Sequence, residues 1–151
     1  MMGKRNLRSL SLAVFGWMLV ALGPLADGQQ QAFMVIAHST LDESSLPKEG
    51  LSDYFLKKKT KWPDGSEIHP VDLNIRDVRE AFSKEVHKRS FSAIKKYWQR
   101  QIFTGRGTPP LEKASVADVL DYVSSTPGAI GYLPSGTRLP AGDLVKVIEL
   151  R

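Results

Sequence analysis

The sequence of 151 residues contains no cysteine. This absence excludes disulfide bridges, thiolate metal sites, a cysteine nucleophile and a lipid-modified cysteine. It suits a bacterial periplasm, where an unpaired thiol risks stray oxidation. Without cross-links the fold must depend on its hydrophobic core. A hydrophobic share of 42% in a chain of this length predicts one domain with one modest core.

The common enzyme motifs are also absent. The chain has no Gly-x-Ser-x-Gly elbow and no P-loop, so it offers no nucleophile and no nucleotide cradle. Its three histidines, at positions 38, 69 and 87, lack the Glu-x-x-His and His-x-x-x-His spacings of metal sites. The carboxylates of residues 77–85 lie among Arg76, Arg79 and Lys84 as charges on a helix surface. We therefore predict no enzymatic activity, no cofactor and no metal.

A long apolar run occurs only near the N-terminus, in residues 10–26. Lys4, Arg5 and Arg8 precede it, and small or polar residues follow it, which is the pattern of a secretory signal peptide. The alternative is a membrane anchor. Glycines and a proline interrupt the run, however, and it falls short of the ~20 residues that a membrane span needs.

We predict a signal peptide of residues 1–28, cleaved near Gly28, and a periplasmic or secreted domain of residues 29–151 with no stable membrane span. Cleavage would remove three cations and one acid, so that the net charge would fall from +5 to +3. The mature domain would be only mildly basic.

The apolar spacing in residues 29–151 predicts alternating strands and helices. The first strand is expected at 32–39, followed by a helix that Ser44 or Ser45 caps and that has Pro47 in its first turn. A Pro-Asp-Gly turn at 63–65 leads into a strand at 67–73, with Pro70 at an edge or strand end. The remaining elements are two helices between Asp72 and Arg100 that break at Arg89 and Ser90, a loop at 103–110, a helix capped by Ser115 that stops at 126–128, and strands at 129–133 and 144–150.

This order of elements predicts an α/β fold, a single three-layer-like lobe with a mixed β-sheet flanked by helices. Ligands of such sheets usually lie at the carboxyl ends of strands and at helix N-termini. Those are the places where we look for a site.

Three segments resemble a known family when they are taken together. They are "YFLKKKTKWPDGSEIHPVD" (54–72), "IKKYWQRQIFTGRGTPP" (94–110) and "TPGAIGYL" (126–133). Their order and spacing resemble the phosphate ABC-transporter substrate-binding proteins, specifically short, single-lobe relatives of the type II periplasmic binding fold. The resemblance covers about residues 32–150. It implies an exported binding domain without enzymatic activity, whose ligand is phosphate or a similar oxyanion.

The sequence departs from this family at two places. The relatives contact phosphate through a loop after the first strand and through a Ser-Gly-Thr motif, whereas the corresponding segment here reads "VDLNIRDVREAF" (71–82). The relatives also have glycine in a Phe-Leu-Gly-Lys turn, where this chain has Lys57.

The candidate ligand-binding residues are Ser39, Thr40 and Arg106. Ser39 and Thr40 follow the first strand, where hydroxyl and N–H groups can converge on an anion. Arg106 is a guanidinium on a glycine-rich loop that could hold an oxyanion bidentately. The alternatives are that the hydroxyls only cap a helix and that Arg106 is a solvated loop residue.

Four lysines, at positions 57, 58, 59 and 61, form the most basic cluster of the chain. They follow a predicted helix, where cations interact favourably with the helix dipole, so we interpret them as a helix end. Binding of nucleic acid is not expected, because a signal peptide directs the chain away from cytoplasmic nucleic acid.

Two hypotheses follow. In the first, the protein binds phosphate or a similar oxyanion and delivers it to an ABC permease for uptake or sensing. In the second, it has kept the fold without a ligand and is a structural or interaction module of the cell envelope, which forms a homodimer or binds an envelope protein.

Overall fold

A computed structural model describes residues 31–142 and 144–151. The predicted signal peptide of residues 1–28 lies outside these residues. The elements are, in order, β1 (Phe33–His38), β2 (Ser45–Leu46), α1 (Lys48–Phe55), β3 (His69–Leu73), α2 (Arg76–Val86), α3 (Phe91–Phe103), β4 (Leu111–Lys113), α4 (Val116–Ser125), β5 (Ala129–Pro134) and β6 (Val145–Leu150). The predicted α/β fold with a mixed sheet is confirmed.

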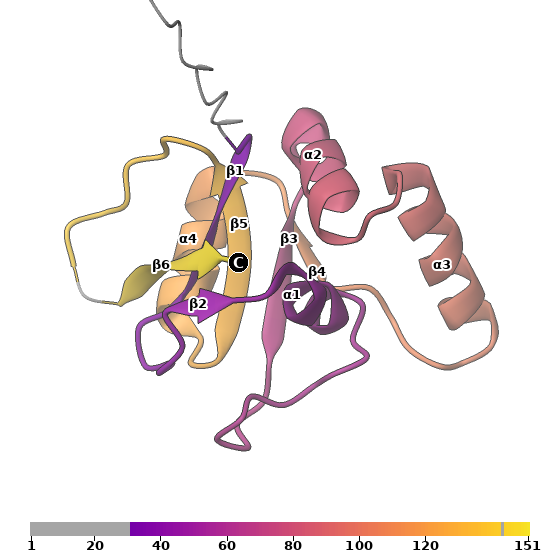
Figure 1. Cartoon of the computed structure of the whole chain (residues 1–151), viewed down its shortest axis with the longest axis horizontal. Helices are drawn as coiled ribbons and strands as arrows, with labels where there is room; N and C mark the ends of the chain where they lie inside the picture. Colours follow the sequence, from indigo (N-terminus) through magenta and orange to yellow (C-terminus); the bar gives the residue numbers. More distant parts are fainter. Residues whose placement is uncertain (1–30, 143) are drawn as a thin grey trace, which may run out of the picture.

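The strands form one sheet in the order β2-β6-β1-β5-β3-β4 (Figure 1). β1 is antiparallel to both of its neighbours, β5 and β6, whereas β3 is parallel to β5, β4 to β3, and β2 to β6. β1 therefore runs against the other five strands. As a result, the carboxyl end of β1 lies at the same end of the sheet as the amino ends of β3 and β5.

The helices cover both faces of the sheet, which neighbouring residues of β5 show. Tyr132 stacks on Phe82 of α2, with ring centroids 4.0 Å apart and planes at 10°, and it also contacts Phe55 of α1. A Cβ atom on the adjacent Gly131 would lie 2.7 Å from Val71 and 3.1 Å from Val119 of α4. Because adjacent residues of a strand point to opposite faces, α4 covers one face and α1 and α2 cover the other.

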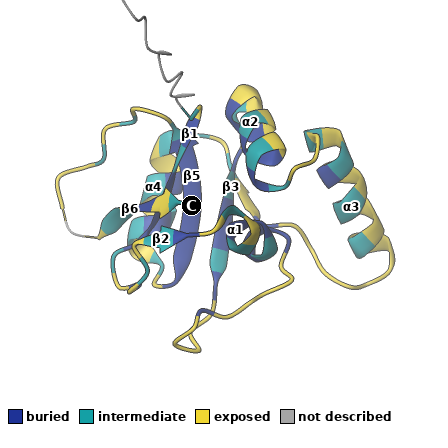
Figure 2. Ribbon diagram, viewed as in Figure 1, coloured by how far each residue is buried: buried dark blue, intermediate teal, exposed yellow. Residues whose placement is uncertain are grey.

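α3 lies outside these layers and packs mainly on α2 (Figure 1). Figure 2 shows the difference in burial: β1, β5 and most of β3 are buried, whereas α3 is mostly exposed or intermediate. Ile94 is the buried side chain of α3, and the hydroxyl of Tyr97 donates a hydrogen bond to the carbonyl of Leu56. α3 is therefore a second layer over α2 and leaves a cleft between the two helices.

Two of the motif segments meet at Gly128. The indole Nε1 of Trp62 donates to the carbonyl of Gly128 at 3.0 Å, and the backbone N–H of His69 donates to the same oxygen at 3.1 Å. Gly128 has φ +82, and a Cβ atom there would lie 2.3 Å from the carbonyl oxygen of Glu67. Glycine is therefore required at this contact. The predicted turn before β3 is also confirmed, since the N–H of Gly65 donates to the carbonyl of Trp62 at 2.9 Å.

The predicted start of α1 was wrong. The residue before the helix is Pro47, and Ser45 belongs to β2, which pairs with β6. The carbonyl of Ser44 accepts a hydrogen bond from the N–H of Glu149. Neither serine caps the helix, because their backbones are bound to a strand about 100 residues away in sequence. Similarly, Asp72 is part of β3 and does not begin a helix.

The break between α2 and α3 at Arg89 and Ser90 is confirmed. The N-cap of α4 is confirmed as well: the hydroxyl oxygen of Ser115 accepts the N–H of Asp118 at 3.1 Å. The predicted lysine cluster does follow a helix end. The N–H of Lys57 donates to the carbonyl of Tyr54, and the N–H of Lys58 donates to that of Asp53, which is a Schellman motif.

Lys57 holds the left-handed position of this motif, with φ 53. A non-glycine residue there costs about 1–2 kcal/mol, and glycine adds about 0.5–1 kcal/mol of chain entropy to unfolding. We predict that Lys57→Gly raises the free energy of unfolding by about 0.5–1 kcal/mol, measured by urea denaturation. The control is Lys59→Gly, at an exposed position without positive φ, which should destabilise. Equal destabilisation by both variants would contradict the prediction.

Candidate anion-binding site

Ser39 and Thr40 form a turn after β1 that is bonded internally. The hydroxyl of Thr40 and Nδ1 of the buried His38 are 2.8 Å apart, and the N–H of Thr40 also donates to Nδ1. The N–H of Ser39 donates to the carbonyl of Leu144 at 3.0 Å. The turn is thus at the end of the sheet where β3, β5 and β6 begin.

Arg106 lies in the loop between α3 and β4 and is exposed. Its N–H donates to the carbonyl of Gln101 at 2.9 Å, and Nζ of Lys57 donates to Pro109 in the same loop. This loop and the turn after β1 lie on opposite sides of the molecule (Figure 1). The structure therefore does not bring Ser39 and Thr40 together with Arg106. Their role in ligand binding stays a prediction.

A cleft of about 1090 Å³ opens between α2 and α3, near the carboxyl end of β3. We call it the α2–α3 cleft. Its lining includes one carboxylate, Glu80, and six cationic side chains: Arg76, Arg79, Lys84, Lys88, Arg89 and Lys95. Such an excess of one charge in a concave surface concentrates the positive potential and attracts anions.

Arg79 is the buried cation of this cleft, because its side chain is only 8% exposed. Its Nε lies 3.4 Å from Oδ2 of Asp72, and its Nη2 lies 2.7 Å from Oε2 of Glu112. Both nitrogens are buried within these ion pairs, whose angles depart from ideal hydrogen-bond geometry. The guanidinium carbon lies 5.1 Å from the centre of the Phe91 ring, at the first residue of α3.

The charges around Arg79 affect one another. Burial raises the pKa of Asp72, although a hydrogen bond from the hydroxyl of Tyr132 and the nearby Arg79 act in the opposite direction. Burial and the neighbouring Asp72 raise the pKa of Tyr132 well above its ordinary value. Burial alone would lower the pKa of Arg79, but the nearby Asp72, Tyr132 and Glu112 together outweigh it and the net shift is upward. Arg79 therefore stays charged and paired with Asp72 and Glu112.

The N-terminus of α3 forms the opposite wall. Ser90 is the N-cap, its hydroxyl oxygen accepts the N–H of Ala93 at 3.3 Å, and the first turn contains no acidic residue. The N–H groups of Phe91 and Ser92 precede the first intrahelical bonds, and both residues line the cleft. A helix N-terminus carries a partial positive charge of about +0.5. The free N–H groups and the positive end of the helix dipole thus lie at the same cleft as Arg79.

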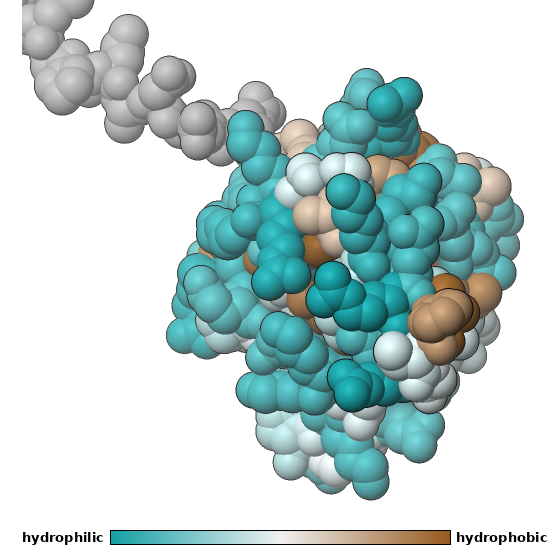
Figure 3. Space-filling view, turned by 90° about the vertical axis from the view of Figure 1, so that its right-hand side faces the viewer, coloured by the Kyte–Doolittle hydropathy of each residue, from teal (hydrophilic) through white to brown (hydrophobic). Residues whose placement is uncertain are grey.

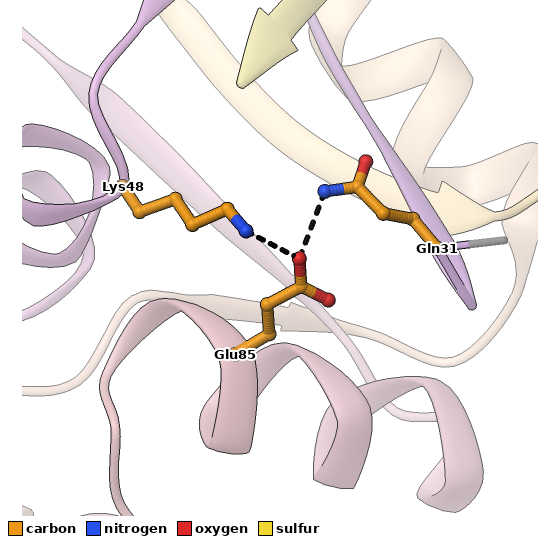
Figure 4. Close-up of polar contacts among 3 residues, drawn as sticks. All are labelled: Gln31, Lys48 and Glu85. Atoms are coloured by element: carbon orange, nitrogen blue, oxygen red, sulfur yellow. Dashed lines mark hydrogen bonds and ion pairs between the residues drawn. The ribbon is translucent and has the colours of Figure 1, made fainter. Parts of the chain in front are cut away.

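The position of α2 is fixed by a contact at its other side. Nζ of Lys48 lies 2.7 Å from Oε1 of Glu85, which also accepts a hydrogen bond from Nε2 of Gln31 at 2.8 Å (Figure 4). Burial would raise the pKa of Glu85, but these hydrogen bonds outweigh it and the pKa is lowered. Glu85 therefore joins α2 to α1 and to the residue two positions before β1.

Sequence reasoning missed this site. Arg79 was expected to be a charge on a helix surface, and this was wrong. It lies three, four and seven residues before Phe82, Ser83 and Val86, all of which are buried. This spacing places it on the inner face of α2 and could have identified it. The basic residues before Ser90 also precede a good N-cap, a pattern that was interpreted only as a break between helices.

Comparison with known proteins identifies the fold. No family model and no curated protein matches the chain. Among solved structures, a phosphate ABC transporter substrate-binding protein with bound phosphate from Clostridium perfringens is similar, with a TM-score of 0.59, 16% identity and 79% of this chain covered. An ABC-type phosphate transport receptor from Vibrio cholerae has a TM-score of 0.56, with 16% identity and the same coverage. PstS from Borrelia burgdorferi has a TM-score of 0.53 and 16% identity, also over 79% of this chain.

The fold is that of the phosphate ABC transporter substrate-binding proteins. The predicted resemblance is thus confirmed at the level of the fold. The chain spans less than half the length of these binding proteins, since the matches cover 44%, 46% and 47% of them. Among the described residues, no helix is both long enough and apolar enough to cross a membrane.

His87, at the end of α2, gives this region a pH dependence. Nδ1 of His87 and the hydroxyl of Ser52 are 2.8 Å apart, and burial, with repulsion from Arg89 and Lys58, lowers the pKa of His87 to about 4. Because the folded pKa lies below the ordinary histidine value of 6.5, the unfolded chain binds the proton first as the pH falls. The contribution of His87 to stability is constant above pH 6.5 and declines between 6.5 and 4.

We predict that wild type loses about 3 kcal/mol more of its unfolding free energy between pH 7 and pH 4 than His87→Gln does. Glutamine can still bond to Ser52 but does not titrate, and the contributions of the carboxylates cancel in the comparison. Urea unfolding at both pH values measures the difference. Parallel pH profiles for the two proteins would show that the pKa of His87 is not lowered by folding.

Proposed function

We propose that residues 29–151 are an exported, non-enzymatic domain that binds phosphate or a similar oxyanion in the α2–α3 cleft, for ABC-type uptake or sensing. The observation that carries the proposal is the lining of the cleft, where six cationic side chains, Arg79 among them, stand with one carboxylate beside the N-terminus of α3. The fold supports it, since one similar protein was crystallised with phosphate. Binding would take place in the periplasm, with an ABC permease as the partner.

The physical basis is the formation of charge-assisted hydrogen bonds between the oxyanion and the cationic groups of the cleft. An oxyanion can accept two hydrogen bonds from one guanidinium and further ones from free N–H groups at a helix N-terminus. Charge-assisted hydrogen bonds are worth about 1.5–3 kcal/mol each. The exposed lysines of the cleft would attract the anion from solution, an effect that salt screens.

The predicted residues Ser39, Thr40 and Arg106 are the competing location for the same function. Thr40 already bonds to His38. Arg106 lies beyond the C-terminal end of α3, which is the negative end of the helix dipole. The 13 residues of α3 place this end about 20 Å from the N-terminus of the helix, which lines the cleft. These facts favour the α2–α3 cleft.

We predict that calorimetric titration with phosphate, sulfate and molybdate shows binding, and that Arg79→Gln weakens it at least about tenfold through loss of a charged donor pair. Lys95→Glu, at an exposed wall position, tests the cleft without disturbing the core and should also weaken binding. Arg106→Gln and the double variant Ser39→Ala/Thr40→Ala are the controls and should bind like wild type.

Circular dichroism and thermal unfolding show whether each variant is folded. Absence of heat with all three anions at millimolar concentration would contradict the proposed function. A loss of binding in the controls, with Lys95→Glu unaffected, would place the site at the originally predicted residues.

A second candidate function is the interaction module, and the end of α3 favours it. Phe103 is 94% exposed and Ile102 is 55% exposed, on a helix that stands out from the body. Figure 3 shows a hydrophobic patch among hydrophilic side chains on this side of the molecule, with smaller hydrophobic areas elsewhere on it. Exposed apolar groups of this kind often mark contact surfaces. The contact would be with another copy, as a homodimer, or with an envelope protein.

For this candidate we predict that light scattering shows a mass that increases with protein concentration and that Phe103→Ser abolishes the increase. Leu111→Ser, which changes another exposed apolar residue, is the matched control. A monomer at all concentrations, together with no partner recovered from periplasm, would contradict it.

A further inference from the structure

We infer that the α2–α3 cleft takes a chain of two or more linked phosphoryl groups in preference to a single phosphate ion. This inference rests on the proposed function, because it assigns a ligand class to the same site. It depends on the size of the cleft and on the distribution of its cations. It also depends on the cation–π contacts that Arg79 and Lys95 make with the ring of Phe91.

The cleft is too large for one phosphate. Its volume of about 1090 Å³ reaches the upper end of the range of roughly 300–1,000 Å³ that holds drug-sized ligands. A single ion at Arg79 and the N-terminus of α3 would leave most of this space to water. A longer anion could extend from Arg79 along both walls.

The cations are spread along the cleft, away from its deepest point. Lys84 lies in the last turn of α2, whereas Lys88 follows the helix with a left-handed backbone (φ 54), and both line the cleft. Lys95 lies on the facing helix, with Nζ 6.0 Å from the centre of the Phe91 ring. Cations that line both walls of one cleft suit the successive groups of a polyanion.

Most of these charges are not neutralised by the protein. Arg76 pairs with Glu80 at 3.1 Å, whereas Lys84, Lys88, Arg89 and Lys95 have no carboxylate within ion-pair distance in residues 31–142 and 144–151. One phosphate group carries about −1.5 to −2 near pH 7, which is less than the charge of these four unpaired cations. Several linked phosphoryl groups match this charge better.

The cleft offers little to a base or a sugar. Phe91 is the one aromatic residue that lines it, within the described chain, and its ring already contacts the cations of Arg79 and Lys95. A nucleobase would have to displace one of these cation–π contacts in order to stack. The inference is therefore an inorganic phosphate chain and not a nucleotide.

The test compares phosphate, pyrophosphate, tripolyphosphate and ATP by calorimetry on the full chain at one ionic strength. Affinity should rise at least about tenfold from phosphate to tripolyphosphate, with a steeper salt dependence. ATP should bind no more tightly than tripolyphosphate. Lys84→Gln/Lys88→Gln should lower the ratio of the tripolyphosphate affinity to the phosphate affinity by about tenfold. The control pair Lys59→Gln/Lys61→Gln, exposed and outside the cleft, should keep the ratio of wild type.

Equal affinities for phosphate and tripolyphosphate would overturn the inference while the proposed function stands. The same holds if ATP binds more tightly than tripolyphosphate, or if the control pair lowers the ratio as much as the cleft pair does. If no anion binds at all, the proposed function fails together with the inference.

Discussion

A buried guanidinium connects the parts of this structure on which its proposed function depends. Arg79 of α2 lies next to Asp72 of β3 and Glu112 of β4, and it covers the ring of Phe91 at the start of α3. Through Asp72 the cluster also includes Tyr132 of β5. A buried charge is costly unless it is paired, and here Asp72 and Glu112 provide the pairing. This paired cation lies in the wall of the α2–α3 cleft, among five further cationic side chains.

The direction of the strands determines where such an anion would bind. β3 ends beside the N-termini of α2 and α3. β1 runs in the opposite direction and therefore ends at the opposite end of the sheet. The general rule that ligands lie at the carboxyl ends of strands therefore has two different outcomes in one mixed sheet. Among the described residues, the end of β3 combines a buried cation, a helix N-terminus and a cleft.

Local chemistry made much of the fold predictable. The N-cap at Ser115, the Pro-Asp-Gly turn, the buried first strand and the break at Arg89 each follow from a few neighbouring residues, and each is present. β2 and β4 were missed because strands of two and three residues carry almost no periodic signal and form by pairing with distant segments. For the same reason Ser44 and Ser45 were misjudged.

The site was harder to predict than the fold. Ser39, Thr40 and Arg106 were chosen from strand ends and loop composition, but the orientation of β1 relative to β3 is a property of the whole sheet. The spacing of Arg79 to Phe82 and Val86 could have shown that it lies on the inner face of α2. The cleft, however, also depends on how α3 packs against α2, which one sequence does not reveal. Lys57 shows the opposite case: glycine was expected at its position from the family resemblance, and its left-handed backbone explains why.

The central claim is that the α2–α3 cleft binds an oxyanion. Backbone amide chemical shifts of the isotopically labelled protein, followed by NMR during titration with phosphate, test it most directly. The account predicts that the largest shifts occur at the N–H groups of Phe91 and Ser92 and at Nε–H of Arg79. Shifts confined to Ser39, Thr40 or the loop around Arg106 would contradict it.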